Sequence, residues 1–150
     1  MKDKTVKILL VEDNSADARW IIEIFKDYHI SNEIDVVTDG VEALNYLYKK
    51  GKYIDAQTPD LIILDLYLPR INGHEVLKKI KNDEKLKSIP VVVLTASNSP
   101  KDPKIAYKNR ANCYISKPVG FEELKKIIKY TGEFWFTVAE IPKYSEIPGK

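Results

Sequence analysis

The amino-acid sequence predicts a single α/β domain, a doubly wound sheet of five parallel strands. Short apolar runs alternate with amphipathic segments along the 150 residues and give five strand–helix pairs. This alternation implies a parallel sheet that is covered by helices on both faces. The predicted strands are nearly continuous apolar runs, which is typical of strands buried on both sides.

The composition is that of a soluble protein, with 44% hydrophobic and 31% charged residues. The formal net charge is only +2 and the lysines are scattered, so we expect neither nucleic acid nor a membrane as a partner. No apolar stretch is long enough to span a bilayer and no signal peptide is evident, which favours a cytoplasmic protein. The single cysteine, Cys113, cannot form an intrachain disulfide and is expected to pack in a core strand.

The first predicted strand is the apolar run 6–11, which ends in the acidic pair Glu12 and Asp13. Ser15 or Asp17 is expected to cap the helix that follows. The apolar positions of that helix recur at helical spacing. They are Ala18, Ile21, Ile22 and Phe25.

The second strand is predicted at 34–37. The helix that follows it is expected to end near Gly51, because glycine readily adopts the left-handed backbone conformation found at helix ends. A polar loop then leads to the third strand, 61–65, which is the most continuous apolar run. The turn 69–73 precedes a third helix. The apolar stripe of that helix is Val76, Leu77 and Ile80.

The fourth strand follows Pro90 and ends in Thr95, and a weak helix is predicted at 104–109, with Pro103 in its first turn. The fifth strand is predicted at 113–115. The fifth helix begins near Phe121. Its apolar stripe is Leu124, Ile127 and Ile128, with a continuation towards Phe134 and Trp135.

Polar residues follow four of the predicted strands. Since the carboxyl ends of parallel strands meet at one edge, we expect these side chains to share one crevice. They are Glu12 and Asp13, Asp65, Thr95 and Lys117. Each has an ordinary explanation when taken alone, such as a turn cap for Asp65 or a helix cap for Glu12 and Asp13, but their coincidence at the strand ends indicates a site.

Crowded carboxylates repel one another unless a cation lies between them. Ligands that are all oxygen favour Mg²⁺ over zinc, and His29 and His74 are expected to lie away from this edge. The Asp65 carboxylate could attack a phosphoryl group and hold it as an acyl phosphate. Lys117 and the metal would neutralise the phosphoryl oxygens, and Thr95 would donate a hydrogen bond to them. The small Ala96 would leave the entrance for phosphate open.

Four segments together resemble the receiver domain of two-component response regulators. They are Val11-Glu12-Asp13-Asn14, Leu64 to Pro69 with Gly73 following, Leu94-Thr95-Ala96, and Tyr114 to Pro118. The resemblance covers about residues 6–131 and implies a flavodoxin-like (βα)5 fold with strand order 2-1-3-4-5. The expected receiver domain is 1–131, and 132–150 would be an extension of the last helix plus a tail, without a separate output domain.

The resemblance implies that a sensor histidine kinase donates a phosphoryl group to Asp65. It implies that Asp13, Asp65 and the backbone carbonyl of Tyr67 bind Mg²⁺, with Glu12 acting through water. It also implies a cis peptide bond at Lys117–Pro118. Such a protein is a phosphoacceptor with at most slow self-catalysed phosphorylation and dephosphorylation, and so is not counted as an enzyme.

Thr95 and Tyr114 match the switch pair of this family. When Thr95 moves towards the phosphoryl group, the ring of Tyr114 is expected to turn inward. That movement would change the surface formed by the fourth helix, fifth strand and fifth helix, as a two-state element biased by a local charge.

The segment 132–138 resembles the C-terminal extension of stand-alone regulators that partner phytochrome-type sensor kinases. In those proteins the extension and the fifth helix help to form a homodimer, and an exposed aromatic patch would suit such an interface. The alternative is that these aromatic residues only extend the last helix over the core.

The sequence departs from the family pattern at Arg110, where many relatives have glycine. A left-handed arginine would cost about 1 kcal/mol, so the fourth helix is expected to end differently. Gly120 replaces a common helix cap, so the fifth helix should lack a capping side chain.

Two other functions compete with the receiver-domain interpretation. A phosphohydrolase with an Asp nucleophile, as in the haloacid-dehalogenase pattern, would need a general acid two residues after Asp65, and that position is Tyr67. A redox protein that binds a flavin or dinucleotide would be expected to carry a glycine-rich turn after the first strand, where this chain has an acidic pair.

Overall fold

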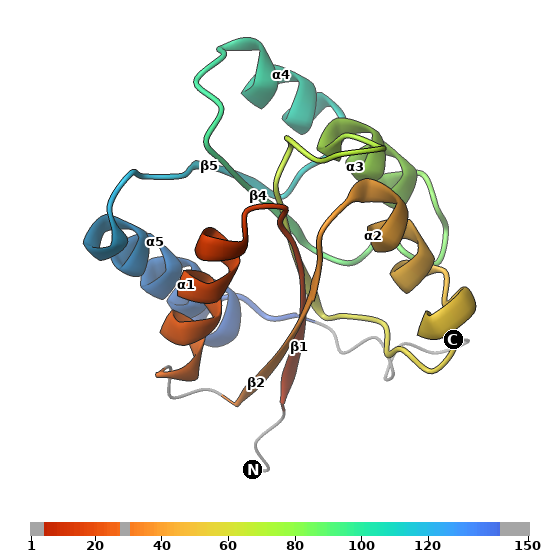
Figure 1. The fold of residues 1–150 in the computed structure, drawn as a ribbon, viewed down its shortest axis with the longest axis horizontal. Coiled ribbons are helices and arrows are strands. Elements are labelled where there is room, and N and C mark those ends of the chain that lie inside the picture. The colour runs from red at the N-terminus through yellow and green to blue at the C-terminus, as the bar shows by residue number, and fades with distance from the viewer. Residues whose placement is uncertain (1–4, 28–30, 142–150) are drawn as a thin grey trace.

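The computed structural model describes residues 5–27 and 31–141, with the backbone alone at 137–138, and Figure 1 draws its ribbon. Within these residues one parallel sheet contains β1 (Val6–Val11), β2 (Asn32–Val37), β3 (Leu61–Leu64), β4 (Val91–Thr95) and β5 (Cys113–Ser116). The strand order is β2-β1-β3-β4-β5. The predicted fold class and strand order are therefore confirmed.

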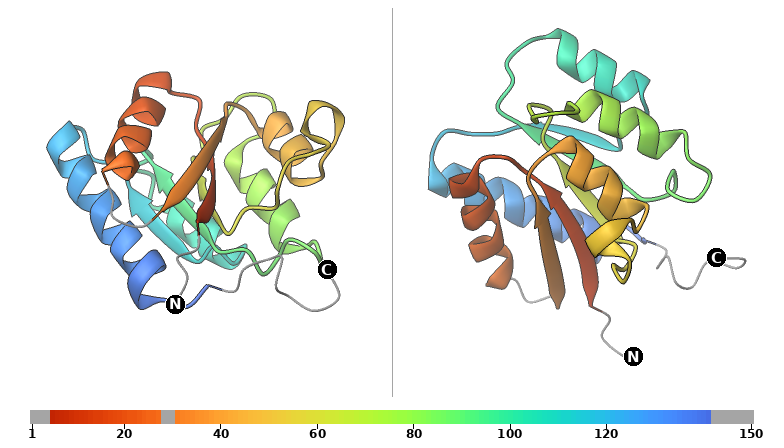
Figure 2. Two further views of the ribbon diagram at one scale, coloured as in Figure 1. Left: turned by 90° about the horizontal axis from the view of Figure 1, so that it is seen from below. Right: turned by 45° about the vertical axis from the view of Figure 1, so that its right-hand side comes forward.

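The helices form a layer on each side of the sheet (Figures 1 and 2). One layer consists of α1 (Ser15–Lys26) and α5 (Phe121–Glu133), and the other of α2 (Gly40–Leu47), α3 (Gly73–Lys81) and α4 (Lys101–Lys108). Two core clusters result. On β3, Ile62 and Leu64 pack in the cluster of α2 and α3, whereas Leu61 and Ile63 pack in the cluster of α1 and α5. The third strand is thus buried on both faces, as its sequence predicts.

The strands end close to one another at one edge of the sheet. Val11 of β1 pairs with Leu64 of β3, and the next residue, Asp65, donates its backbone N–H to the Val11 carbonyl at 3.0 Å. Thr95 of β4 pairs with Ser116 of β5. This register brings the residues that follow the strands into one neighbourhood.

The first helix begins one residue earlier than predicted. Its cap is Asn14, whose side chain accepts a hydrogen bond of 2.9 Å from the backbone N–H of Asp17. Ser15 is already helical, so neither predicted cap was right: a cap needs the extended backbone that Asn14 has directly before the first helical residue. The buried stripe includes Ile24, while Ile22 is only half-buried.

The second helix ends at Leu47, earlier than predicted. Lys49 is left-handed at φ 58°, and Gly51, which is also left-handed at φ 60°, opens the short 3-10 helix η1 (Gly51–Tyr53). Glycine therefore has the predicted conformation, but it lies in the loop after the helix. Cys113 lies on the edge strand β5 and is half-buried there instead of enclosed in the core.

The fourth helix begins at Lys101, and Pro103 lies in its first turn as predicted. Arg110 takes the left-handed conformation itself, with φ 71°, so the expectation of a different helix end was wrong. Its guanidinium donates a 2.8 Å hydrogen bond to the side-chain oxygen of Asn82, a contact that glycine could not make. Gly120 precedes α5 without a side-chain cap, as predicted.

The last helix continues into a π-helical turn, η2 (Phe134–Val138). Trp135 and Phe136 pack against the cluster of α1 and α5, and the Phe136 ring lies 5.8 Å from the ring of Phe25. Phe134 remains 50% exposed. The extension therefore covers the core in part and leaves aromatic surface free in part. No helix within the described ranges is long and apolar enough to cross a membrane.

Candidate functional site

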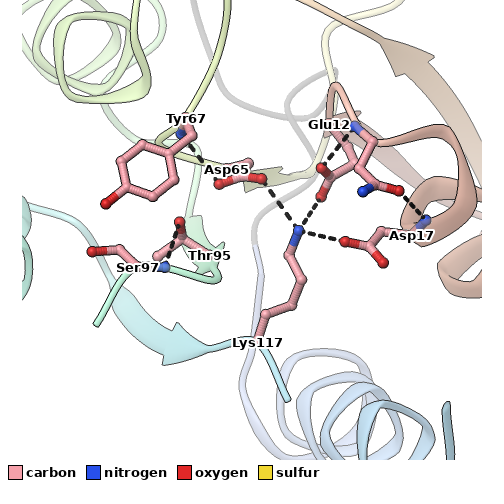
Figure 3. Close-up of polar contacts among 8 residues, drawn as sticks. Glu12, Asp17, Asp65, Tyr67, Thr95, Ser97 and Lys117 are labelled. Atoms are coloured by element: carbon pink, nitrogen blue, oxygen red, sulfur yellow. Dashed lines mark hydrogen bonds and ion pairs between the residues drawn. The ribbon is translucent and has the colours of Figure 1, made fainter. Parts of the chain in front are cut away.

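The site lies where β1, β3 and β5 end, and Figure 3 shows its side chains. Glu12 follows β1, Asp65 follows β3, and Lys117 follows β5. All three side chains are buried, with exposed fractions of 2%, 8% and 6%. The sequence prediction that these residues converge is therefore supported by the geometry.

The Lys117 ammonium lies at the centre of a carboxylate cluster (Figure 3). Its Nζ atom is 2.9 Å from Glu12 Oε1, 2.9 Å from Asp17 Oδ2 and 3.2 Å from Asp65 Oδ2. Because an ammonium has three N–H donors, these three carboxylates match its full donor set.

The cluster carries more negative than positive charge. Burial raises the pKa of Glu12 to about 7, and although the hydrogen bond from Lys117 opposes this rise, the charge of Asp65 adds to it. Burial alone would lower the pKa of Lys117, but the hydrogen bonds to Asp17 and Glu12 and the charge of Asp65 outweigh it and raise the pKa. The lysine therefore stays charged, and the remaining negative charge favours a further cation.

The backbone around Asp65 fixes its carboxylate. The backbone N–H of Tyr67 donates to Asp65 Oδ1 at 3.2 Å. The N–H of Gly73 donates to the Leu66 carbonyl at 2.8 Å, which brings the start of α3 directly against this loop. A Cβ atom on Gly73 would lie 2.3 Å from the Asp65 carbonyl oxygen, so only glycine fits without a shift of the backbone.

The predicted metal ligands are only partly assembled. Asp13 is exposed, and Tyr67, whose backbone carbonyl is the fourth predicted ligand, has an exposed side chain. No group of three His, Cys, Asp or Glu side chains in the described ranges is close enough to form a ready metal cage. The donor types nevertheless fit Mg²⁺, since all of them are oxygens, and the surplus of carboxylates over ammonium supplies the negative charge that such an ion needs.

Thr95 and Ala96 lie at the end of β4. Thr95 is fully buried, and its hydroxyl accepts a 3.4 Å hydrogen bond from the backbone N–H of Ser97. Ala96 is exposed, in keeping with the predicted open entrance. The ring of Tyr114 is half-buried against the cluster of α2, α3 and α4, and burial raises the pKa of its hydroxyl.

One feature expected from the family resemblance is wrong. The described residues contain no cis peptide bond, so Lys117–Pro118 is trans, the form that most X–Pro bonds adopt. With this trans bond Lys117 still reaches the carboxylate cluster, and its backbone N–H donates to the Thr95 carbonyl at 2.7 Å.

The sequence predicts Asp17 only as a possible helix cap, whereas in the structure its carboxylate contacts Lys117. The signal was available, because the first turn of the helix after β1 starts at the same edge of the sheet. His74 does not join the acidic cluster: its Nε2 lies 2.9 Å from Asp102 Oδ1, and Asp102 also accepts a hydrogen bond from the Ser97 hydroxyl. These hydrogen bonds from His74 and Ser97 lower the pKa of Asp102. His29 lies outside the described residues.

The chain resembles known proteins over the range that contains these motifs. The family model described as response regulator receiver domain matches residues 8–129. Response regulator Rcp1 of Synechocystis sp. (strain ATCC 27184 / PCC 6803 / Kazusa) is 40% identical over 135 residues, which cover 90% of this chain and 92% of Rcp1. The probable methanogenesis regulatory protein FilR2 of Methanothrix harundinacea (strain 6Ac) is 44% identical over 130 residues, covering 85% of this chain and 82% of FilR2.

Solved structures agree with the sequence comparisons. The phosphorylated cyanobacterial phytochrome response regulator RcpA superposes with a TM-score of 0.91 at 45% identity, covering 93% of this chain and 100% of RcpA. The Mn²⁺-bound form of Rcp1 gives a TM-score of 0.89 at 39% identity and covers 92% of this chain and 99% of Rcp1. The similarity thus extends over nearly the whole chain.

Proposed function

The chain belongs to the response regulator receiver-domain family, and from this premise we propose that it accepts a phosphoryl group on Asp65 from a sensor histidine kinase. The observation that carries the proposal is the position of Asp65. Asp65 follows a strand buried on both faces. Its carboxylate accepts a hydrogen bond from the backbone N–H of Tyr67 and lies 3.2 Å from the Lys117 ammonium. A carboxylate held in this way is both fixed in place and supported by positive charge.

In the proposed reaction an Asp65 oxygen attacks the phosphorus of the kinase phosphohistidine. The new O–P bond forms as the N–P bond breaks, and the electron pair of that bond returns to the imidazole. Lys117 stabilises the negative charge on the transferred oxygens. Thr95 donates its hydroxyl to one of them once its side chain turns towards Asp65.

The metal that we propose is Mg²⁺, held by Asp13, Asp65 and the Tyr67 carbonyl, with Glu12 acting through water. When bound, the ion supplies positive charge to the phosphoryl oxygens. Two observations support it: the oxygen-only donor set, and the similarity to Rcp1, whose structure was solved in a Mn²⁺-bound form.

We further propose that phosphorylation changes the surface of α4, β5 and α5 through the switch pair Thr95 and Tyr114, and that this surface with the C-terminal extension forms a homodimer. Apolar side chains are exposed on these elements: Ile105, Tyr107, Tyr130 and Phe134 are 40%, 52%, 73% and 50% exposed. A phytochrome-type kinase is the proposed donor, supported by the similarity to RcpA, which is named as a phytochrome response regulator.

The competing phosphohydrolase is not favoured. Two residues after Asp65, where a general acid would be needed, stands Tyr67, whose ring is 60% exposed and ends in a phenol instead of a carboxyl group. Labelling of the acceptor with at most slow release of phosphate is expected instead of enzyme-like turnover.

Intact-mass spectrometry after incubation with acetyl phosphate and Mg²⁺ tests the acceptor. The wild type should gain one phosphoryl group and Asp65→Asn none. Equal labelling of both proteins would reject Asp65 as the acceptor, and steady release of phosphate at enzyme-like turnover would favour the phosphohydrolase. Sedimentation with and without beryllofluoride, which mimics the acyl phosphate, tests the dimer.

A further inference from the structure

Among the carboxylates that contact Lys117 within the described ranges, Asp17 is the one that the proposed reaction does not use. Glu12 and Asp65 come from strand ends and have roles in binding the metal or the phosphoryl group, whereas Asp17 comes from the first turn of α1. Its carboxylate is 2.9 Å from Lys117 Nζ, shorter than the 3.2 Å contact between Lys117 and the acceptor Asp65. A contact this close to a buried ammonium requires an explanation.

We propose that Asp17 is a positioning residue that holds the Lys117 ammonium on the α1 side of the site and so opposes its transfer to the phosphoryl group on Asp65. The inference rests on the function proposed above and deepens it, because it concerns the strength with which the same site holds a phosphoryl group. In this view Asp17 sets the balance between the unmodified and phosphorylated states.

The carboxylates on the two sides of the Lys117 ammonium attract it in opposite directions. Figure 3 shows Asp17 and Glu12 on one side of the ammonium and Asp65 on the other. Asp17 is itself fixed, since its backbone N–H donates to the Asn14 cap at 2.9 Å. With its backbone anchored and its side chain 24% exposed, Asp17 lies between solvent and the buried lysine.

The three donors of Lys117 are shared between the acceptor and the α1 side of the site. One N–H group points at Asp65, so it can pass to a phosphoryl oxygen once Asp65 is modified, while the other two point at Glu12 and Asp17. The 2.9 Å contact with Asp17 therefore opposes a closer approach of the ammonium to the phosphoryl group. Removing the charge of Asp17 weakens this opposing contact without touching a proposed metal ligand.

The test compares Asp17→Asn with Glu23→Gln. Both changes remove one negative charge from α1, but the Glu23 side chain is 60% exposed and pairs only weakly with Lys26, at 3.9 Å. Beryllofluoride binding is measured by calorimetry at saturating Mg²⁺, so that a change in metal affinity does not alter the measured affinity for beryllofluoride. We expect Asp17→Asn to bind beryllofluoride roughly twofold to fivefold more tightly than the wild type, the range for loss of one partly exposed ion pair, and Glu23→Gln to be unchanged.

A second measurement needs no metal. The side-chain ammonium of Lys117, held by three acceptors, should give a protected nitrogen–proton NMR signal in the wild type and in Glu23→Gln. In Asp17→Asn the signal should exchange faster with water, because the neutral amide oxygen is a weaker acceptor than the carboxylate. Asp17→Glu, which keeps the carboxylate, should preserve it, and Asp17→Ser supplies the same charge removal with a residue that suits a helix start if the amide variant folds poorly.

Three results would overturn the inference: equal or weaker beryllofluoride binding by Asp17→Asn, equal tightening in Glu23→Gln, or an ammonium signal that exchanges no faster in Asp17→Asn than in the wild type. If instead the wild type binds no beryllofluoride and takes no phosphoryl group from acetyl phosphate, the proposed function itself fails. The two failures are therefore distinguishable.

Discussion

Replacement of Glu12 by glutamine tests how much the ionised, buried Glu12 carboxylate destabilises the fold. The pKa of Glu12 is raised from its ordinary 4.5 to about 7, chiefly by burial, with the charge of Asp65 contributing. The folded state therefore holds the proton more tightly than the unfolded state does. It follows that the free energy of unfolding falls as the pH rises from about 4.5 to about 7, and remains lower above that range.

The size of this loss of stability follows from the rise in the pKa of Glu12. Since one pKa unit corresponds to about 1.4 kcal/mol, the ionised Glu12 destabilises the metal-free fold by roughly 3 kcal/mol at pH 8. Glutamine has nearly the same shape, and its carbonyl can still accept a hydrogen bond from Lys117, but it cannot ionise. Relative to the wild type, Glu12→Gln should therefore gain about 3 kcal/mol between pH 4.5 and pH 8.

Urea unfolding in the presence of a chelator, followed by circular dichroism at several pH values, measures this gain. Glu122→Gln is the matched control, because Glu122 is exposed in the first turn of α5. The reasoning is refuted if the stability difference between Glu12→Gln and the wild type stays constant within about 0.5 kcal/mol over the pH range, or if the wild type becomes the more stable protein as the pH rises.

Three further changes have expected outcomes. Asp102→Asn should lower the free energy of unfolding by about 1–2 kcal/mol at pH 7 in thermal or urea melts, because it weakens the hydrogen bond from His74. Since the pKa of Asp102 is lowered in the folded state, this contribution is present above about pH 4 and is lost as the pH falls further. The stabilities of the two proteins should therefore converge in acid. Gly73→Ala should destabilise the fold by about 1–3 kcal/mol and slow labelling by acetyl phosphate, because its Cβ would meet the carbonyl of the acceptor residue; an unchanged melting temperature would contradict that contact. Lys81→Met should lower the free energy of unfolding by about 2–4 kcal/mol in urea melts, because the buried Lys81 ammonium donates to two backbone carbonyls and an asparagine oxygen. The control Lys79→Met, at an exposed position, should have little effect. Equal effects of the two changes would show that the buried hydrogen bonds are not stabilising.

The sequence by itself determined the sheet and the chemistry at its edge. Continuous apolar runs require burial on both faces, and parallel strands must end at the same edge, so Asp65, Glu12 and Lys117 could be expected to meet before any coordinates were known. The glycine at 73 was part of the same motif. These predictions depend on local pattern and on one topological rule, and both can be read along the chain.

Only the tertiary structure decided which groups touch. Asp17 and Lys117 are 100 positions apart, and their contact depends on how α1 and the end of β5 approach one another across the edge of the sheet. Likewise the left-handed Arg110 is held by Asn82 of another helix end, and the trans bond before Pro118 still lets Lys117 reach the cluster. Such contacts are set by packing between distant elements, which local sequence patterns do not encode. The consequence is that the sequence predicted the acceptor and its lysine, while the fold added a further carboxylate, Asp17, in contact with that lysine.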